Sequence, residues 1–380
     1  MLQLMPKSMN GRQNCVIGLH ASRSATSVKL DSLIRTAPSW MSGADDADGI
    51  VLSCRARLAR NLANYPFATR ITRPQQQQVI DEVLAAAKSS RSMSTATYFG
   101  MSVLDGDERR VLVERHLISP TLADEKGERG VLFNQDESLS VMINEEDHLR
   151  LQAISPGTRG REAFTAICAL DDELLAAIDC AHDSRLGFLT ACPTNTGTGL
   201  RLSVLIHLPA LVLTEDMERV LQGLGQLSFT VRGMYGEGSN AAGNLFQISN
   251  QATLGASEES ILEELIRITE QLVGFEREAQ DSLRQEARGQ VEDKVWRAFG
   301  LLSQARILTS QEFMNLLSAV RLGCTLGLVT GVPSSFLNHL MIATQPSHLR
   351  ADAGRGLTPA ERDLRRAEIV RNKLSEVTNS

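Results

Sequence analysis

The pattern of hydrophobic residues changes once along the chain, and this change constrains the fold more than any other feature. From Gly49 to about Gln251, short runs with the two-residue period of β-strands alternate with polar or glycine-rich loops. After Gly255, nearly every segment has the period of an α-helix. We therefore predict an α+β domain over residues 37–255 and a helical domain over residues 256–380.

Three strand-like segments of the first part place polar residues on one face. The segment SLSVMIN (138–144) alternates in the way that indicates a half-buried strand. In RLSVLIHL (201–208), Arg201 lies on the face opposite the apolar side chains, and in FTVRG (229–233) Arg232 does the same. The segment PQQQQVIDEVLAAAKSS (74–90) has a helical pattern. Strands and helices mixed in this way are typical of an α+β domain.

The second part carries helix start signals. Ser257 is an expected N-cap, Thr309 with Glu312 forms a capping-box pattern, and a second such pattern begins at Thr358 with Pro359 at the first helical position. Apolar stripes on three or more helices predict a bundle, in which Trp296 and Phe299 fill the interior or a dimer seam. Because such bundles often bury a seam, we predict a homodimer.

Composition excludes several classes of protein. A net charge of −6 gives no electrostatic footprint for nucleic acid, and no stretch is apolar enough to span a bilayer. The six cysteines are scattered, without a CxxC pair or a zinc-ligand cluster, which favours a reducing cytoplasm. Residues 1–36, rich in Ser and without an acid among the first thirty, are expected to form a disordered extension.

Four segments could carry chemistry. The segment INEEDHLR (143–150) ends a strand in three consecutive acids, which alone would indicate a solvated turn. It is accompanied by three segments that combine glycine or serine loops with an arginine: VLSCRARLARN (51–61), CPTNTGTGLR (192–201) and VRGMYGEGSN (231–240). Each of these alone is a weak signal. Together they supply several arginines and a group of carboxylates.

Arginines can bind a polyphosphate without a specialised loop. The chain has no GxxxxGK[ST] motif and no HRD or DFG set, so neither a P-loop nor a protein-kinase fold is indicated. Guanidinium groups bind phosphate oxygens in pairs and stay charged, so a cage of arginines is an alternative. Carboxylates beside such a cage would repel phosphate, and a cationic acceptor supplies the reason for their presence.

These four segments, in this order and at these separations, resemble the phosphagen (guanidino) kinase family over about Gly49 to Gly255. The resemblance implies a glutamine-synthetase-like catalytic domain with an antiparallel sheet flanked by helices. It also implies transfer of the γ-phosphate of ATP, with Mg²⁺, to a guanidinium nitrogen.

The resemblance also implies roles for single residues. Glu146 and Glu237 would grip the guanidinium, with Glu146 as the base, and Cys192 would orient the acceptor as a thiolate. The remaining expected site residues bind the nucleotide: Arg55, Arg57, His116, Arg150, Arg201 and Arg232. For His116 and His148 a purely structural role is the alternative, and no residue is expected to bind a metal. Cys54 stands where the family has Ser or Thr, a departure expected to leave the chemistry intact.

Two features resemble the bacterial protein-arginine kinase (McsB-type) branch of this family. Only a short stretch precedes Cys54, which implies an acceptor pocket open to an arginine side chain of another protein, and a helical C-terminal domain follows. In that domain RDLRRA resembles a phosphoarginine-binding allosteric motif, with Arg362, Asp363 and Arg366 at matching positions. Without the resemblance, this segment would be a charged, solvent-facing first turn.

This branch implies a cytoplasmic stress-response enzyme whose phosphoarginine marks damaged proteins for Clp-type proteolysis. The partners so implied are protein substrates bearing arginine, a zinc-binding activator protein and a Clp ATPase or protease. Two alternatives stay open. One is a kinase for free arginine, and the other is an inactive adaptor that binds phosphoarginine and feeds a protease.

Overall fold

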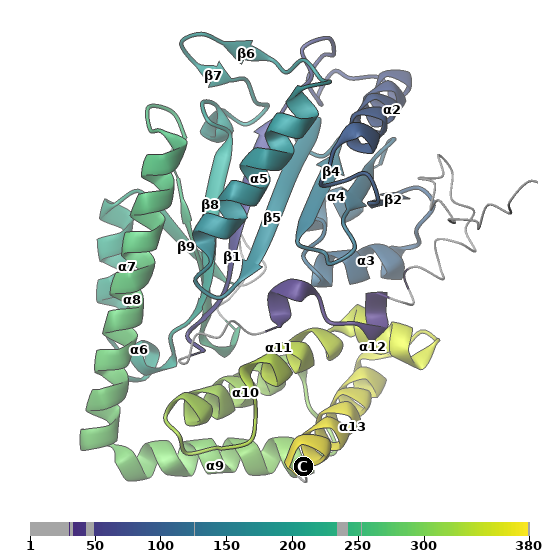
Figure 1. Ribbon diagram of the computed structural model, residues 1–380. Helices are drawn as coiled ribbons and strands as arrows, with labels where there is room; N and C mark the ends of the chain where they lie inside the picture. The colour runs from purple at the N-terminus through teal and green to yellow at the C-terminus, as the bar shows by residue number, and fades with distance from the viewer. Residues whose placement is uncertain are drawn as a thin grey trace, which may run out of the picture.

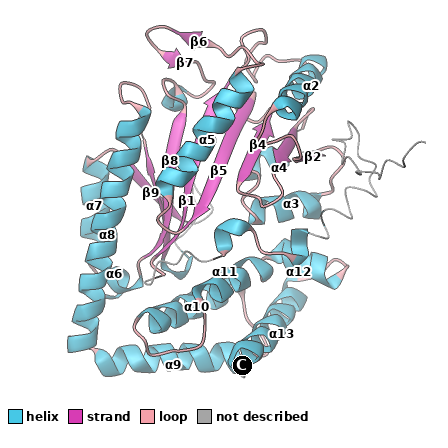
Figure 2. Ribbon diagram, in the orientation of Figure 1, coloured by secondary structure: helices cyan, strands magenta, loops and turns pink. Residues whose placement is uncertain are grey.

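The computed structural model describes residues 30, 33–42, 49–124, 126–233, 242–251 and 253–378. Within these residues an antiparallel sheet, with helices against it, precedes a cluster of helices (Figures 1 and 2). The predicted α+β fold with a helical C-terminal region is therefore confirmed.

An eight-stranded sheet forms the first part, in the order β2-β3-β4-β5-β1-β8-β10-β9. Every neighbouring pair is antiparallel. Its strands are β1 (Val51–Arg60), β2 (Thr97–Gly100), β3 (Gly130–Phe133), β4 (Leu139–Ile143), β5 (Leu149–Pro156), β8 (Leu200–His207), β9 (Phe229–Gly233) and β10 (Leu245–Asn250), and a separate hairpin pairs β6 (His182–Asp183) with β7 (Gly187–Phe188).

Helices complete the first part and form the second. The first part contains α2 (Arg73–Ser89), α3 (Gly106–Glu114), α4 (Pro120–Asp124), α5 (Gly160–Leu175), α6 (Pro209–Leu213), α7 (Met217–Gln226) and the short 3₁₀ turns η1 (Ser39–Met41), η2 (Pro193–Asn195) and η3 (Ala242–Asn244). The C-terminal helices are α8 (Glu258–Glu286), α9 (Arg288–Gln304), α10 (Ser310–Thr325), α11 (Ser334–Ala343), α12 (Pro346–Ala353) and α13 (Pro359–Thr378).

The two faces of β1 have different surroundings because side chains alternate along a strand. Cys54, Ala56 and Leu58 enter a large apolar core with residues of α2, α5 and α8, the helices that cover one face of the sheet (Figure 1). Arg55 and Arg57 lie on the other face, half-buried. The position of Cys54 in the core, where its thiol donates to Gly157 O (3.3 Å), keeps it away from the arginine face.

A second core holds the C-terminal helices together and attaches them to the sheet. Its residues come from α9, α10, α11 and α13, with Trp40 and Met41 of η1 and the strand residues Leu52, Ile154 and Leu205. Helix α8 contributes instead to the core of the sheet, from Ile261 to Ala279. The boundary between the two cores therefore lies near Ala287 rather than at Gly255. The hydrophobic period of α8 shows that the segment is a helix, but it does not show which core the apolar side of that helix joins.

The expected helix starts are present. Ser257 Oγ accepts a hydrogen bond from Ser260 N (3.1 Å), and Thr309 Oγ1 accepts one from Glu312 N (3.2 Å). At Thr358 the capping box is complete, since Thr358 N donates to Glu361 Oε2 (2.8 Å) and Glu361 N donates back to the threonine hydroxyl (3.3 Å).

Three expectations need correction. Strand β4 is buried on both faces rather than half-buried, because Leu139, Val141 and Ile143 join the large core and Met142 joins a smaller one around α3. Leu30 is also buried in that smaller core, with Leu33 and Ile34 packed against it, so the folded part begins before Ala37. Trp296 is 51% exposed and does not fill the bundle, so of its two expected positions only the dimer seam stays a prediction.

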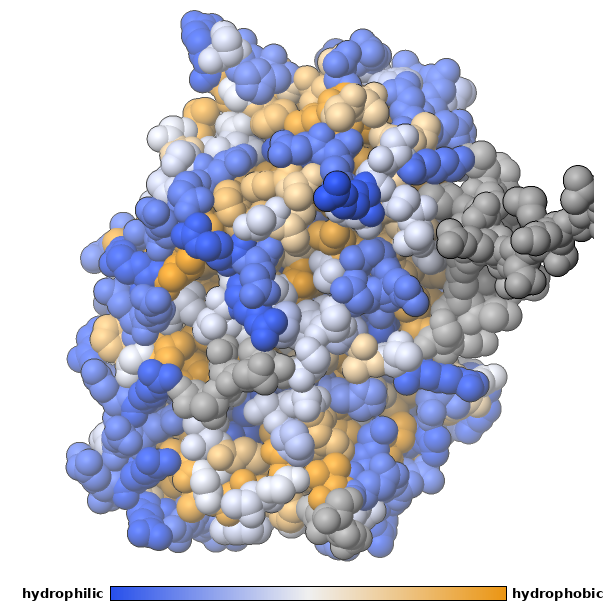
Figure 3. Space-filling view, in the orientation of Figure 1, coloured by the Kyte–Doolittle hydropathy of each residue, from blue (hydrophilic) through white to orange (hydrophobic). Residues whose placement is uncertain are grey.

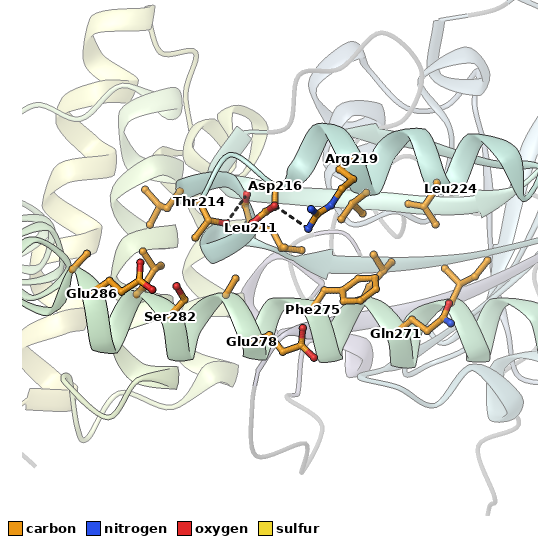
Figure 4. A pocket seen from close by; sticks show the side chains of 18 of the residues that line it. Leu211, Thr214, Asp216, Arg219, Leu224, Gln271, Phe275, Glu278, Ser282 and Glu286 are labelled. Atoms are coloured by element: carbon orange, nitrogen blue, oxygen red, sulfur yellow. Dashed lines mark hydrogen bonds and ion pairs between the residues drawn. The ribbon is translucent and has the colours of Figure 1, made fainter.

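The surface in Figure 3 is mostly hydrophilic, with several separate apolar patches, one of them over the C-terminal helices. An apolar groove of about 800 Å³ runs between α7 and α8 (Figure 4). Leu224 and Phe275 line it, and the Asp216–Arg219 ion pair lies at its α7 side. Within the part of the chain that the structure describes, no helix has both the length and the apolar character needed to cross a membrane.

Candidate active site

Five arginines from four strands face one cavity of about 490 Å³. Arg55 and Arg57 lie two residues apart on β1 and therefore share a face. Arg201 on β8 is directly opposite Arg57, since antiparallel pairing aligns these two residues. The other two arginines of the cavity are Arg150 of β5 and Arg232 of β9. All five expected cage arginines are thus brought together.

The cage concentrates positive charge on side chains that are partly buried. Burial, followed by repulsion from Arg150 and Arg201, lowers the pKa of Arg55 from its usual value of 12.5 to about 10. The same causes, with the charge of Arg55 added, hold the pKa of Arg57 well below its usual range. Such a concentration of like charge is unfavourable on its own, and a polyphosphate would neutralise it.

The three consecutive acids have different surroundings. Glu145 is 2% exposed, forms an ion pair with Arg150 and accepts a hydrogen bond from Ser119 Oγ. It fixes one cage arginine and links it to the start of α4. Glu146 is exposed and lines the cavity. The sequence analysis singled out Glu146 alone and missed the role of Glu145, because nothing in the triplet shows which side chain is buried.

Asp147 and His148 fasten this turn to the rest of the domain. Asp147 Oδ1 accepts hydrogen bonds from Asn61 Nδ2 and from Ala191 N, both at 2.6 Å. The imidazole of His148 accepts at Nδ1 from Leu62 N (3.1 Å), which leaves Nε2 to donate to Pro66 O (3.1 Å). The structural alternative for His148 is therefore the one observed.

Because Asp147 binds the main chain at Ala191, the following residue, Cys192, is held beside Glu146 in the cavity. The thiol of Cys192 lies 3.0 Å from Thr194 Oγ1 and also hydrogen-bonds to the Glu146 carboxylate. Although Glu146 is exposed toward the cavity, the surrounding walls partly remove it from water, and this desolvation is the main cause that raises its pKa above the usual value, with Arg150 opposing it. A carboxylate with a raised pKa is a better proton acceptor than an ordinary surface glutamate.

The loop that carries Cys192 is anchored from behind by Thr253. Its hydroxyl oxygen lies 2.8 Å from Thr194 O and 2.7 Å from Thr196 O, so its single proton is shared between these two carbonyls. Gly197 adopts φ +114°, and a Cβ there would lie 2.6 Å from Thr253 O, so only glycine fits. The sequence analysis identified this loop but not its support, because Thr253 lies far away in the chain.

His116 also lines the cavity, as expected. Its backbone has φ +60°, its carbonyl accepts from Gln152 Nε2 (2.7 Å), and its ring packs edge-on against Trp40, with centroids 5.2 Å apart. Burial and the charges of Arg55 and Arg57 lower the pKa of His116 to about 3. The imidazole is therefore neutral at any working pH.

Other lining residues escaped sequence reasoning. They are mostly polar or small side chains without a motif: Ser119, Thr121, Gln152, Thr194, Asn195, Gln247 and Ser249. Gln247, opposite Arg232 on β10, could have been found from strand alternation if the register had been known. Glu237, the second expected carboxylate, lies outside the described residues.

The three residues of the C-terminal motif lie apart from this cavity. Arg366 is 1% exposed and donates to Leu308 O (2.7 Å), Thr344 O (3.1 Å) and Asp363 Oδ1 (2.6 Å). These bonds use Nε and Nη1 of its guanidinium to hold the start of α13 in place, and the expected part of Arg366 in ligand binding stays a prediction. Arg362 and Asp363 are partly exposed.

The arrangement fits a nucleotide with its magnesium ion. Among the described residues, no group of three or more His, Cys, Asp or Glu lies together in a way that could hold a metal ion. Magnesium usually keeps several waters and binds through substrate phosphates with one or two carboxylates, so it needs no such cage. The arginines would hold the phosphates, and Mg²⁺ would neutralise charge between them.

Two family models together match most of the chain. The ATP:guanido phosphotransferase C-terminal catalytic domain matches residues 77–279, and the protein-arginine kinase McsB C-terminal domain matches residues 288–380. A protein-arginine kinase of Moorella thermoacetica is 47% identical over 339 residues, which cover 88% of this chain and 97% of that protein. One of Desulforamulus reducens is 44% identical, with coverage of 90% and 96%.

Solved structures show the same fold. A lombricine kinase matches with a TM-score of 0.54 at 25% identity, over 67% of this chain and 77% of the other. A duplicated taurocyamine kinase from Schistosoma mansoni, with transition state analog components bound, matches with a TM-score of 0.56 at 20% identity, over 77% of this chain and 44% of the other.

Proposed function

The chain belongs to the ATP:guanido phosphotransferase family and, within it, to the protein-arginine kinases, and from this premise we propose that it phosphorylates arginine side chains of proteins. The γ-phosphate of ATP is transferred to a guanidinium nitrogen. The observation that carries the proposal is the convergence of Glu146 and Cys192 with five arginines on one cavity.

The residues of the cavity have different roles in the reaction. Arg55, Arg57 and the three other cage arginines hold the phosphates of ATP and stabilise negative charge on the transferring group. Mg²⁺, bound with the nucleotide, supplies further neutralisation of that charge. His116, neutral, lines the nucleotide side.

Glu146 acts on the acceptor. A guanidinium has a pKa above about 12 and is a poor nucleophile, so it must be aligned and lose a proton as it attacks. As the nitrogen–phosphorus bond forms and the bond to the ADP oxygen breaks, the proton passes to the Glu146 carboxylate. We assign Cys192 to orientation of the same nitrogen and Glu237 to the second carboxylate that grips the guanidinium.

A protein substrate is favoured over free arginine by two observations. The curated relatives that the chain matches over nearly their whole length are protein-arginine kinases. The last 93 positions, 288–380, match the C-terminal domain of that same branch. A kinase for free arginine remains the second candidate, and the same experiment separates the two.

The test is mass spectrometry under non-acidic conditions, which preserve the nitrogen–phosphorus bond. Unfolded casein is incubated with ATP and Mg²⁺ and either wild-type protein or Glu146→Gln, which keeps the size of the side chain but not its basicity. We expect phosphoarginine on casein with wild type, and a loss of about 10²–10⁴-fold in rate with the variant. A free-arginine reaction is run in parallel.

Each result decides one point. Phosphoarginine on free arginine but not on casein would replace the proposal by a kinase for the amino acid. No product on either substrate, with ATP bound normally, would favour the adaptor that binds phosphoarginine. Equal kinase rates for wild type and Glu146→Gln would show that Glu146 is not the general base.

The finer parts of the function are proposals as well. We assign the enzyme to stress-response protein quality control in the cytoplasm, where phosphoarginine marks proteins for a Clp ATPase or protease and a zinc-binding protein activates the kinase. The free cysteines Cys54, Cys168, Cys180, Cys192 and Cys324 support a reducing compartment. Co-purification of a Clp subunit with arginine-phosphorylated substrate, and not with untreated substrate, would support the marking role.

Allosteric binding of phosphoarginine is proposed for Arg362 and Asp363, with Arg366 as the residue that positions them. A phosphoarginine peptide should change the kinase rate of wild type but not of Arg362→Ala. We also propose a homodimer, and a monomer mass in light scattering at micromolar concentration would contradict it.

A further inference from the structure

A second polar cavity, of about 410 Å³, lies between the N-terminal segment and the C-terminal helices. It adjoins the RDLRRA segment, because its lining residue Asp352 forms an ion pair with Arg365. Its walls come from residues 34–35, α11, α12 and α13. In Figure 1 the purple N-terminal segment lies beside α12. None of the cage arginines and none of Arg362, Asp363 and Arg366 lines it, so it is separate from both sites discussed above.

Basic side chains from four segments meet there: Arg35, His339 of α11, His348 of α12 and Lys373 of α13. The one carboxylate among the lining residues, Asp352, is already engaged, since its Oδ2 accepts from Arg365 Nη2 (2.7 Å) and Nε (2.9 Å). In the described part of the chain, neither Arg35 nor Lys373 takes part in an ion pair. The cavity therefore carries uncompensated positive charge.

His348 is built firmly into the wall. It is 2% exposed, and its Nδ1 lies 2.7 Å from Glu114 Oε2, while the same carboxylate accepts from Ser347 N (2.8 Å) and His348 N (3.1 Å). The ring is thus held by α3. Its second nitrogen, Nε2, has no hydrogen-bond partner among the described residues.

The electrostatic environment of His339 agrees with a cavity in which positive charges outnumber the one carboxylate of Asp352. Burial lowers its pKa, and the positive charges of Lys373 and Arg115 lower it further, as does His348. Arg115 is neutralised locally by its buried ion pair with Glu137. Lys373 has no such partner, and repulsion of this kind is relieved when an anion binds.

We propose that this cavity binds a small phosphate monoester, with its phosphate between Arg35 and Lys373 and its organic part against the apolar wall. A phosphate carries up to two negative charges near neutral pH, which matches the two unpaired cations. The apolar wall consists of Ile34, Ala343, Ala351 and Ile369. The volume exceeds that of an inorganic ion and falls within the usual range of about 300–1,000 Å³ for small-ligand sites.

The consequence is structural. Because the ligand would contact the N-terminal segment and three C-terminal helices at once, it would hold them together. Binding to the folded state alone stabilises that state.

The experiment follows the histidine ring signals by NMR in full-length protein labelled on histidine, with phenyl phosphate as the probe. The His339 signal is assigned from its loss in His339→Asn. This local readout separates the cavity from the arginine cage, which also attracts phosphates. We expect saturable shifts of the His339 and His348 signals. Lys373→Gln should weaken binding about tenfold, the loss of about one ion pair, whereas Lys88→Gln, an exposed lysine on α2, should leave it unchanged.

Three results would overturn the proposal. These are an absence of shifts in wild type, equal affinity in Lys373→Gln, or binding of benzoate as tight as that of phenyl phosphate. If inorganic phosphate bound as tightly as phenyl phosphate, the apolar wall would have no role in binding an organic group. Kinase activity on casein is measured for each variant, and we expect Lys373→Gln to retain it. A failure of the cavity proposal would therefore leave the kinase proposal intact.

Discussion

Among single residues, neighbours in the sequence have opposite roles. Glu145 is buried in an ion pair with Arg150, while Glu146, the next residue, is exposed to the cavity. On strand β1, Arg55 and Arg57 face the cavity, whereas the preceding residue, Cys54, faces the core. Function at this scale depends on which side chain a turn or strand presents, and two predictions test it.

The first concerns Arg57, whose positive charge is repelled by Arg55, Arg150 and Arg201. Arg57→Met removes the charge and keeps an unbranched side chain. We expect at least a tenfold loss of ATP affinity together with a rise of about 1–3 °C in Tm, because relief of repulsion stabilises the empty protein. Calorimetric titration with ATP and a thermal melt measure both. A fall in Tm would contradict the repulsive role of the cage.

The second concerns the pH dependence of Glu146. Because its pKa in the folded protein is raised above 4.5, the stability it contributes is complete below 4.5 and is lost as the pH rises through the folded pKa. Glu146→Gln should therefore be slightly more stable than wild type at pH 7, and the difference should shrink as the pH falls toward 4.5. Urea unfolding across this range measures it. Kinase rates of wild type should fall as the pH drops through the same raised pKa.

Among the elements of the fold, the loop from Thr190 to Gly199 decides whether Cys192 reaches Glu146. It is held by Asp147 at one end and by Thr253 near the other. Gly197→Ala would place a Cβ 2.6 Å from Thr253 O at a positive φ. We expect the unfolding free energy to fall by about 2 kcal/mol. We also expect the kinase rate to fall, by a larger fraction of its wild-type value than the unfolding free energy does.

The matched control is Gly223→Ala, in α7, where a Cβ would have nothing within 4 Å. It should leave kinase activity unchanged and stabilise the helix slightly. Denaturant unfolding and the casein reaction measure both variants. If Gly197→Ala kept wild-type kinase activity, the geometry of this loop would not matter to Cys192.

For the whole molecule, the sheet and the C-terminal helices meet around η1. Trp40 is 2% exposed in the second core and packs against His116 at the arginine cavity. Trp40→Ala should cost about 3–5 kcal/mol of unfolding free energy and lower kinase activity, because it creates a cavity beside a site residue. Trp296→Ala, at a side chain that is 51% exposed, should change stability by less than about 0.5 kcal/mol. Equal losses in urea unfolding would contradict this.

The sequence by itself determined the elements and the kind of chemistry. Strand period placed Arg201 and Arg232 on the polar faces of their strands, helix caps at Ser257 and Thr358 marked starts that the structure contains, and the motifs indicated a guanidino kinase. These features are local, because side-chain direction and capping depend on a few neighbouring residues.

Only the tertiary structure decided which distant residues meet. The pairing of Arg201 with Arg57, the burial of Glu145, the support of the Cys192 loop by Thr253 and the membership of α8 in the core of the sheet all depend on long-range contacts. The basic cavity around Lys373 is the clearest case, since four segments that are separate in the sequence form it. Periodicity fixes the direction of a side chain within its own element, whereas register and packing fix what lies opposite it.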